Sequence, residues 1–129
     1  MVAIDTNILV RFLTRDDKLQ HAKAEKIFRA QSVFIPDTVF LETEWVLRFS
    51  YGFQPDAVTS SFKKLLGLPN VQVNDQDLLH KAIEWHEAGL DFADTLHLAA
   101  CSHCTRLVTF DNSFIKKAKG LTKCKVGLP

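Results

Sequence analysis

The stretch Met1-Val2-Ala3-Ile4-Asp5 is a short apolar run that ends in an acid. A second run, Leu107-Val108-Thr109-Phe110, ends in Asp111 in the same way. Short apolar runs of this kind predict buried strands. In open α/β sheets, ligand sites lie beyond the carboxyl ends of the strands. The two acids are therefore candidate site residues at one edge of a sheet.

Two further acids are set in apolar sequence, Glu42 within residues 39–47 and Asp94 within residues 92–100. A carboxylate in apolar surroundings must be protonated, paired or metal-bound. Glu42 falls in the first turns of an expected helix, and Asp94 lies near the start of another, where the helix dipole favours negative charge. The topology therefore predicts that Asp5, Glu42, Asp94 and Asp111 meet at the same sheet edge.

Four gathered carboxylates repel one another, and a hard divalent cation with oxygen ligands is the simplest remedy. Carboxylates that hold such a cation are typical of metal-dependent phosphodiester cleavage.

Short strands alternate with helical patterns along the chain. Strands are predicted at 2–4, 33–35, 71–73, 107–109 and, from a weaker pattern, 125–127, and helices at 19–30, 38–49, 55–66, 74–88 and 91–104. This alternation predicts a three-layer α/β/α sandwich around a central, mostly parallel sheet of about four to five strands. A length of 129 residues favours a single domain over 1–129.

Composition adds little about partners. The net charge of +1 argues neither for nor against nucleic acid, because the distribution of charge matters more than its sum. The sequence contains three cysteines, an odd number. We see no secretory leader and no apolar run long enough to span a bilayer. We expect no membrane partner and a reducing, cytoplasmic location.

Four motifs occur in a fixed order, Ile4-Asp5-Thr6-Asn7, Leu41-Glu42-Thr43, Asp91-Phe92-Ala93-Asp94 and Val108-Thr109-Phe110-Asp111. In sequence, order and spacing they resemble the PIN domain, and most closely the VapC-type toxins of bacterial toxin–antitoxin pairs. The resemblance covers essentially the whole chain. It implies a Mg²⁺- or Mn²⁺-dependent endoribonuclease that leaves a 5′-phosphate and a 3′-hydroxyl, is inhibited by a cognate antitoxin and is commonly a homodimer.

The resemblance also implies roles for individual residues. Asp5 and Asp94 would bind the first metal directly, while Glu42 and Asp111 would complete its shell, directly or through water, or help to hold a second ion. The supporting residues implied are Thr6, Asn7 and Thr109, which would orient the carboxylates, and Asp91, which would reach the metal through water. Glu44 lies two residues beyond Glu42, so it points to another helix face and is not expected to be a ligand.

Basic residues are the candidates for binding RNA phosphates. Residues 112–129 contain five lysines and no acid, and Lys116 and Lys117 are the first of them. Arg11 and Arg15 follow Asp5 and are expected one helical turn apart. Phe110, next to Asp111, is the aromatic residue best placed to stack on a base.

Some of these residues also fit other interpretations. Asp111 could cap a helix, as Asp37 and Asn74 are expected to do. A zinc site at His97, Cys101 and Cys104 is disfavoured, because structural zinc sites usually draw ligand pairs from separate segments. A phosphatase of the haloacid dehalogenase type would need an acid where Asn7 stands. An RNA-binding PIN-like module, or an RNA-processing nuclease outside a toxin–antitoxin pair, is the alternative function.

The predicted helices at 19–30 and 38–49 carry more apolar residues than one small core requires. We expect them to form a groove for a helical antitoxin segment, which would place an arginine among the acids.

Overall fold

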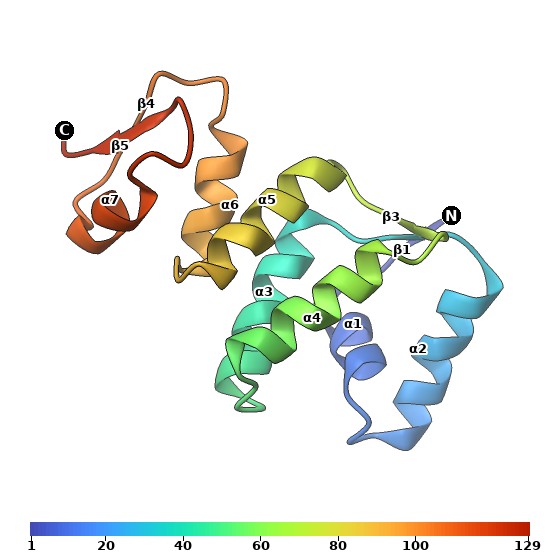
Figure 1. Cartoon of the computed structure of the whole chain (residues 1–129). Helices are drawn as coiled ribbons and strands as arrows, with labels where there is room; N and C mark the ends of the chain where they lie inside the picture. Colours follow the sequence, from blue (N-terminus) through green and yellow to red (C-terminus); the bar gives the residue numbers. More distant parts are fainter. The chain divides into compact units, whose positions relative to one another are not determined.

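Five short strands and seven helices alternate along the chain in the computed structural model, which describes every residue from Met1 to Pro129 (Figure 1). The chain forms two units, Met1–Gln76 and Asp77–Pro129. Each unit has a parallel sheet of its own. The two units are described in turn.

The first unit is built on three parallel strands in the order β1 (Val2–Ala3), β2 (Val33–Phe34), β3 (Val71–Gln72). Val2 pairs with Val33, which pairs in turn with Val71. The helices of this unit are α1 (Thr6–Leu13), α2 (Lys18–Ala30), α3 (Asp37–Phe49) and α4 (Pro55–Leu66). α1 packs against both α2 and α3.

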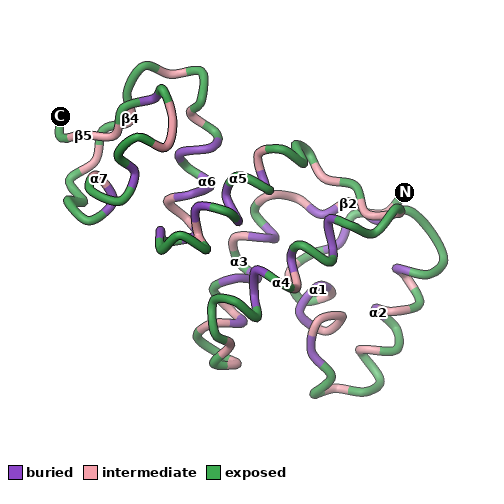
Figure 2. Tube along the Cα trace, viewed as in Figure 1, coloured by how far each residue is buried: buried purple, intermediate pink, exposed green.

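The spacing of apolar residues explains how α4 packs. Pro55 is its first residue, where the missing N–H costs nothing. Val58, Phe62 and Leu65 follow at intervals of four and three residues and are all buried, so they form one face. Figure 2 shows buried stretches along α4 alternating with exposed ones. The Phe62 ring meets that of Phe40 on α3 edge-on, with 5.2 Å between centroids.

The second unit contains most of α5 (Gln76–Glu87), then α6 (Phe92–Ala100), β4 (Arg106–Val108), α7 (Asn112–Ala118) and β5 (Lys125–Gly127). β4 and β5 are parallel, with Leu107 opposite Val126. A buried cluster from three helices and the α5–α6 connection holds this unit together, made of Trp85, Leu90, Leu98, Ala99, Phe114 and Ala118. Leu107 and Val126 pack on it, so the sheet and the helices share one core.

The predicted α/β class with parallel pairing is confirmed, and all five predicted strands are present. They divide into sheets of three and two strands. The helix predicted over 91–104 ends at Ala100, because Cys101–Cys104 form a turn closed by the Cys104 amide and the Cys101 carbonyl, 2.9 Å apart.

Two helices, α1 and α7, are absent from the predicted set. They have eight and seven residues, too short for a helical period of apolar residues to stand out. Both begin at an aspartate cap. No helix in the structure has the length and apolar content needed to cross a membrane.

Candidate active site

Asp5 connects the first strand to the first helix. Its Oδ1 accepts a 3.0 Å hydrogen bond from the Ile8 amide, so the side chain caps α1. The residue is exposed, and its second carboxylate oxygen has no hydrogen-bond partner. Asp5 can therefore stabilise the helix with one oxygen and offer the other to a ligand.

A pocket of about 790 Å³ lies between the start of α1 and α3. Asp5 and Glu42 both line it, although 37 positions separate them in the sequence. Thr6 and Asn7 line the same pocket. The first unit thus brings together two of the four predicted acids with two of their predicted supporting residues.

The remaining lining of this pocket is of two kinds. The apolar surface includes Val10, Val39 and Val46. The polar groups include those of Arg11 and Tyr51. The pocket therefore combines acids, a cation and apolar surface in one open cleft.

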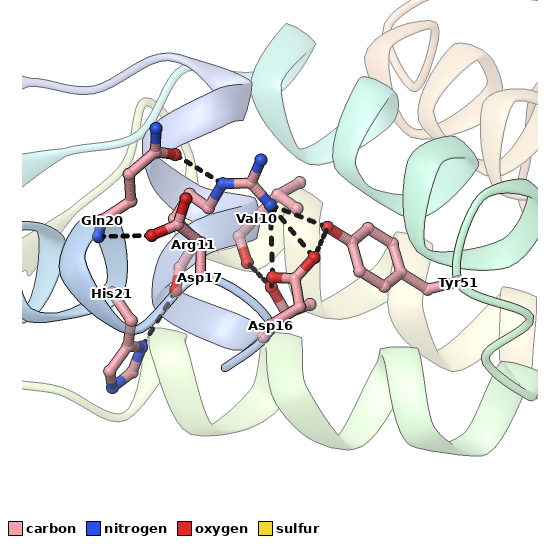
Figure 3. Close-up of polar contacts among 8 residues, drawn as sticks. Val10, Arg11, Asp16, Asp17, Gln20, His21 and Tyr51 are labelled. Carbon is pink, nitrogen blue, oxygen red and sulfur yellow. Dashed lines mark hydrogen bonds and ion pairs between the residues drawn. The ribbon is translucent and has the colours of Figure 1, made fainter.

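A hydrogen-bonded network fixes Arg11 (Figure 3). Its Nε donates to Oε1 of Gln20 at 2.6 Å, and its Nη1 donates to both carboxylate oxygens of Asp16, each at 3.2 Å, and to the Tyr51 hydroxyl oxygen at 3.0 Å. Its Nη2 has no partner. Burial lowers the pKa of Arg11, but the charges of Asp16 and Tyr51 and the hydrogen bond to Tyr51 together raise it above its ordinary value, so the guanidinium stays charged.

The network around Arg11 was not predicted, because Tyr51 lies 40 residues from Arg11 and no local pattern links them. The expected helical spacing of Arg11 and Arg15 is wrong. α1 ends at Leu13 and Thr14 is extended, so Arg15 lies in the connection to α2 and shares no helix face with Arg11.

The second unit carries the other two acids. Asp94 is the third residue of α6 and is half-buried. Burial raises its pKa most, and the negative charges of Asp91 and Asp111 raise it further, against a lowering effect of His97. Asp91, Asp94 and Asp111 therefore lie close enough to repel one another, as the ligand prediction requires.

Asp111 and Asp91 are both helix caps. Oδ1 of Asp111 accepts from the Phe114 amide at 3.0 Å, so the capping interpretation of Asp111 is confirmed. Oδ2 of Asp91 accepts from the Ala93 amide at 3.1 Å. Thr109 supports Asp111 directly, because its Oγ1 accepts a 3.0 Å hydrogen bond from the Asp111 amide.

Three of the four acids, Asp5, Glu42 and Asp111, are exposed. The expectation of apolar surroundings is wrong for Glu42, which stands on an open helix face, and Asp5 and Asp111 stand exposed at helix starts. Asp94 is half-buried, and burial raises its pKa.

The donor set fits a hard divalent cation. In the first unit, the carboxylate oxygens of Asp5 and Glu42 and the side-chain oxygen of Asn7 are ligands that Mg²⁺ prefers. In the second unit, the repulsion of Asp94 by Asp91 and Asp111 is what a cation would relieve. Each unit contributes two acids of the quartet, and no three His, Cys, Asp or Glu side chains form a ready-made metal site within either unit. His97, Cys101 and Cys104 form no such cluster either.

Two neighbouring acids have other roles. Glu44 is buried and is paired with Arg48, whose Nε donates to its Oε2 at 2.8 Å. Asp37 is not a cap: Pro36 takes that position, and one buried carboxylate oxygen of Asp37 has no hydrogen-bond partner. Burial, and then the charge of Asp75, raises the pKa of Asp37.

The remaining predicted RNA contacts lie in the second unit. Lys116 and Lys117 are exposed on α7, and the Lys117 ammonium donates to the Gly89 carbonyl at 3.1 Å. Phe110, next to Asp111 in the sequence, is 83% exposed.

The helices at 19–30 and 38–49 do not form the expected antitoxin groove between them. α1 packs against both of these helices, and the cleft lies between α1 and α3 instead. The exposed apolar residues Leu19, Trp45 and Phe49 do not line this cleft.

A family model described as the PIN domain matches residues 2–120. The chain therefore belongs to the PIN-domain family. The crystal structure of Mycobacterium tuberculosis VapC20, a toxin that cleaves the sarcin-ricin loop, is similar with 20% identity and a TM-score of 0.44 over 97% of this chain and 99% of that chain. No curated protein matches significantly.

Proposed function

We propose that this protein is a Mg²⁺- or Mn²⁺-dependent endoribonuclease that acts as a toxin and is inhibited by a cognate antitoxin. The observation that carries the nuclease proposal is the meeting of Asp5 and Glu42 in one open pocket, with Asn7 beside them, in a chain of the PIN-domain family. The toxin role rests on the motif resemblance alone. Because the family model extends across both units, it supports one PIN domain over 1–129.

Asp5 and Asp94 would hold the first metal, with Glu42 and Asp111 completing its shell or helping to hold a second ion. When bound, the ion would acidify a water molecule and offset negative charge on the phosphoryl oxygens. The chain itself positions the acids. The caps of α1 and α7 orient Asp5 and Asp111, and the Thr109 hydroxyl fixes the backbone of Asp111.

Arg11 would bind a substrate phosphate from the wall of this pocket. Its Nε and Nη1 are already engaged, so Nη2 is the nitrogen open to a phosphate oxygen. Because the guanidinium is held by Gln20, Asp16 and Tyr51, little side-chain entropy is lost when a phosphate binds. Arg15, Lys116 and Lys117 would add contacts to the RNA backbone from the surface.

The test of nuclease activity is cleavage of total RNA by the purified full chain, with Mg²⁺, with Mn²⁺ and with a chelator. We expect metal-dependent cleavage that Asp5→Asn and Asp94→Asn each abolish, with products that carry a 5′-phosphate. Glu44→Gln is the matched control, because Glu44 is an acid on the same helix as Glu42 but outside the pocket. RNA binding without cleavage would instead favour the alternative, a PIN-like binding module.

The pocket also suggests how an antitoxin would inhibit. An arginine of the antitoxin would pair with Asp5 and Glu42, while apolar residues beside it would contact Val10, Val39 and Val46. Inhibition by the co-expressed antitoxin should weaken when that arginine is changed to alanine, and excess Mg²⁺ should compete with it. A complex in which the antitoxin leaves this pocket open would contradict the proposal.

A homodimer in the cytoplasm is the assembly and location we propose. All three cysteines are free thiols, which suits a reducing compartment. Sedimentation of the purified chain would test the dimer, and a single monomeric species at micromolar concentration would exclude it.

A further inference from the structure

The second unit contains a pocket of about 650 Å³ that no predicted site residue except Lys116 explains. The residues that line it come from α7, the turn after it and β5. Helix α7 packs against β5 (Figure 1). Its rim carries four lysines, Lys116, Lys119, Lys123 and Lys125, and no acid lines it. We propose that this pocket binds one nucleotide of the single-stranded RNA substrate, with the phosphates on the lysines and the base on the apolar wall.

The charge of the pocket indicates an anionic ligand. None of its four lysines forms an ion pair, and residues 112–129 contain no Asp or Glu that could neutralise them. Four ammonium groups around one cavity repel one another, and an anion would offset this repulsion. The short helix α7 points its carboxyl end at this region, but a helix dipole is weaker than several full charges.

The lining of the pocket indicates that the ligand also has an apolar part. Ile115, Ala118 and Val126 contribute hydrocarbon surface between the lysines. A free inorganic anion would leave that surface uncovered. A nucleotide has both parts, since any base offers a flat face to an apolar wall while its phosphates reach the rim.

The size of the pocket selects a single nucleotide. Small-molecule sites commonly span about 300–1,000 Å³, which accommodates one nucleotide but no double helix. Single-stranded RNA is also the form whose bases can turn outward into a protein pocket. The pocket therefore fits one unpaired residue of a strand.

The pocket is close to a proposed catalytic acid in the same unit. Asn112, which lines it, directly follows Asp111. α7 has seven residues, so its two ends are roughly 10 Å apart at 1.5 Å per residue. A strand whose scissile phosphate lies near Asp111 would place a nucleotide a short distance along the chain in this pocket.

The turn that closes the pocket is held in shape by its backbone. Gly120 has a φ of +80°, a conformation that other residues rarely adopt. The Leu121 amide donates to the Ala118 carbonyl at 3.1 Å, and the Cys124 amide donates to the Thr122 hydroxyl at 3.0 Å. Lys119 and Lys123, on either side of Gly120, are therefore carried by a fixed loop.

The proposal rests on RNA being the substrate, but it is tested by binding alone. The full chain, with a chelator present to prevent cleavage, is titrated with a labelled single-stranded RNA oligonucleotide of about ten residues at several salt concentrations. We expect Lys119→Ala/Lys123→Ala to weaken binding roughly 10- to 25-fold at 0.1 M salt, and to reduce the slope of log K against log salt by about 1.4. Lys119→Arg/Lys123→Arg should restore both values.

The matched control is Lys64→Ala/Lys81→Ala, which removes two exposed lysines that do not line the pocket. An equal loss of affinity in both double variants, or no loss in the pocket variant, would overturn the proposal. So would binding of adenosine monophosphate as tight as binding of the oligonucleotide, because the pocket would then be a site for free nucleotides.

A second measurement locates the ligand. Methyl resonances of Ile115 and Val126 should shift when the oligonucleotide is added, and unchanged resonances at saturation would also overturn the assignment. Failure of the nuclease proposal can be told apart from failure of the pocket proposal. If the protein binds RNA in this pocket but does not cleave it with Mg²⁺, the nuclease proposal is wrong and the pocket proposal holds. If the unchanged protein cleaves RNA but Lys119→Ala/Lys123→Ala binds RNA as tightly as the unchanged protein, only the pocket proposal is wrong.

Discussion

The Tyr51 hydroxyl donates a 2.8 Å hydrogen bond to Oδ2 of Asp16, 35 residues earlier in the chain. The same hydroxyl oxygen accepts from Nη1 of Arg11, so the three side chains form a closed triangle (Figure 3). This triangle fastens the segment after α3 to the connection between α1 and α2. It therefore fixes the wall of the pocket that carries Arg11.

Tyr51→Phe should lower the melting temperature at neutral pH, because it removes two hydrogen bonds of this triangle. The hydrogen bond from Tyr51 is the first cause that holds the pKa of Asp16 below its ordinary value of 3.8. An acid with a lowered folded-state pKa stabilises the protein above its unfolded pKa and loses this effect as pH falls through the folded value. The difference between Tyr51→Phe and the unchanged protein should therefore shrink below about pH 4.

A double-mutant cycle with Asp16→Ala is the control for this prediction. In the Asp16→Ala background, Tyr51→Phe should cost much less than it does alone. Equal losses in both backgrounds would show that the Tyr51 hydroxyl does not act through Asp16.

Asp5 and Asp111 each combine a cap with a proposed ligand role, and two substitutions separate these roles. Asparagine caps a helix about as well as aspartate, whereas alanine costs about 1 kcal/mol. We expect Asp5→Asn to keep the melting temperature of the metal-free protein and to lose RNA cleavage. Asp5→Ala should lose both, and Asp111 should behave in the same way. Full cleavage by Asp5→Asn would show that only the cap matters.

Asp94 should destabilise the metal-free protein at neutral pH. Burial first, and then Asp91 and Asp111, raise its folded-state pKa above 3.8. The unfolded chain releases this proton more readily, so stability falls as pH rises from 3.8 through the raised value. Asp94→Asn should melt at a higher temperature at pH 7, and the difference should vanish below pH 3.8. Saturating Mg²⁺ should stabilise the unchanged protein and have little effect on Asp94→Asn.

Phe110 and Phe114 provide a pair of aromatic residues with opposite environments. Phe110 is 83% exposed, and Phe114 is 5% exposed in the core of the second unit. Phe110→Ala should leave stability nearly unchanged but weaken RNA binding, by about 1–3 kcal/mol if one base stacks on it. Phe114→Ala should cost about 3–5 kcal/mol of stability. Unchanged RNA affinity in Phe110→Ala would rule out the stacking role.

The sequence by itself determined the strands and the helices long enough to show a period. The apolar runs at 2–4, 33–35 and 71–73 became the three-stranded sheet. Its central strand is the buried one, with Val33 and Ile35 fully buried, whereas Ala3 and Gln72 on the edge strands are exposed. Helix α4 begins and ends where Pro55 and Leu66 predicted. The motifs that carry Asp5, Glu42, Asp94 and Asp111 were also sufficient to indicate the family that the match over 2–120 establishes.

Only the tertiary structure decided which side chains meet. Asp5 and Glu42 share a pocket because α1 packs on α3, and Tyr51 reaches Arg11 across 40 residues for the same reason. The lysine-lined pocket appeared as a cavity only once the Gly120 turn brought β5 back against α7. Sequence patterns report local periodicity and burial, whereas contacts between distant residues depend on how complete elements pack, and no local pattern records that.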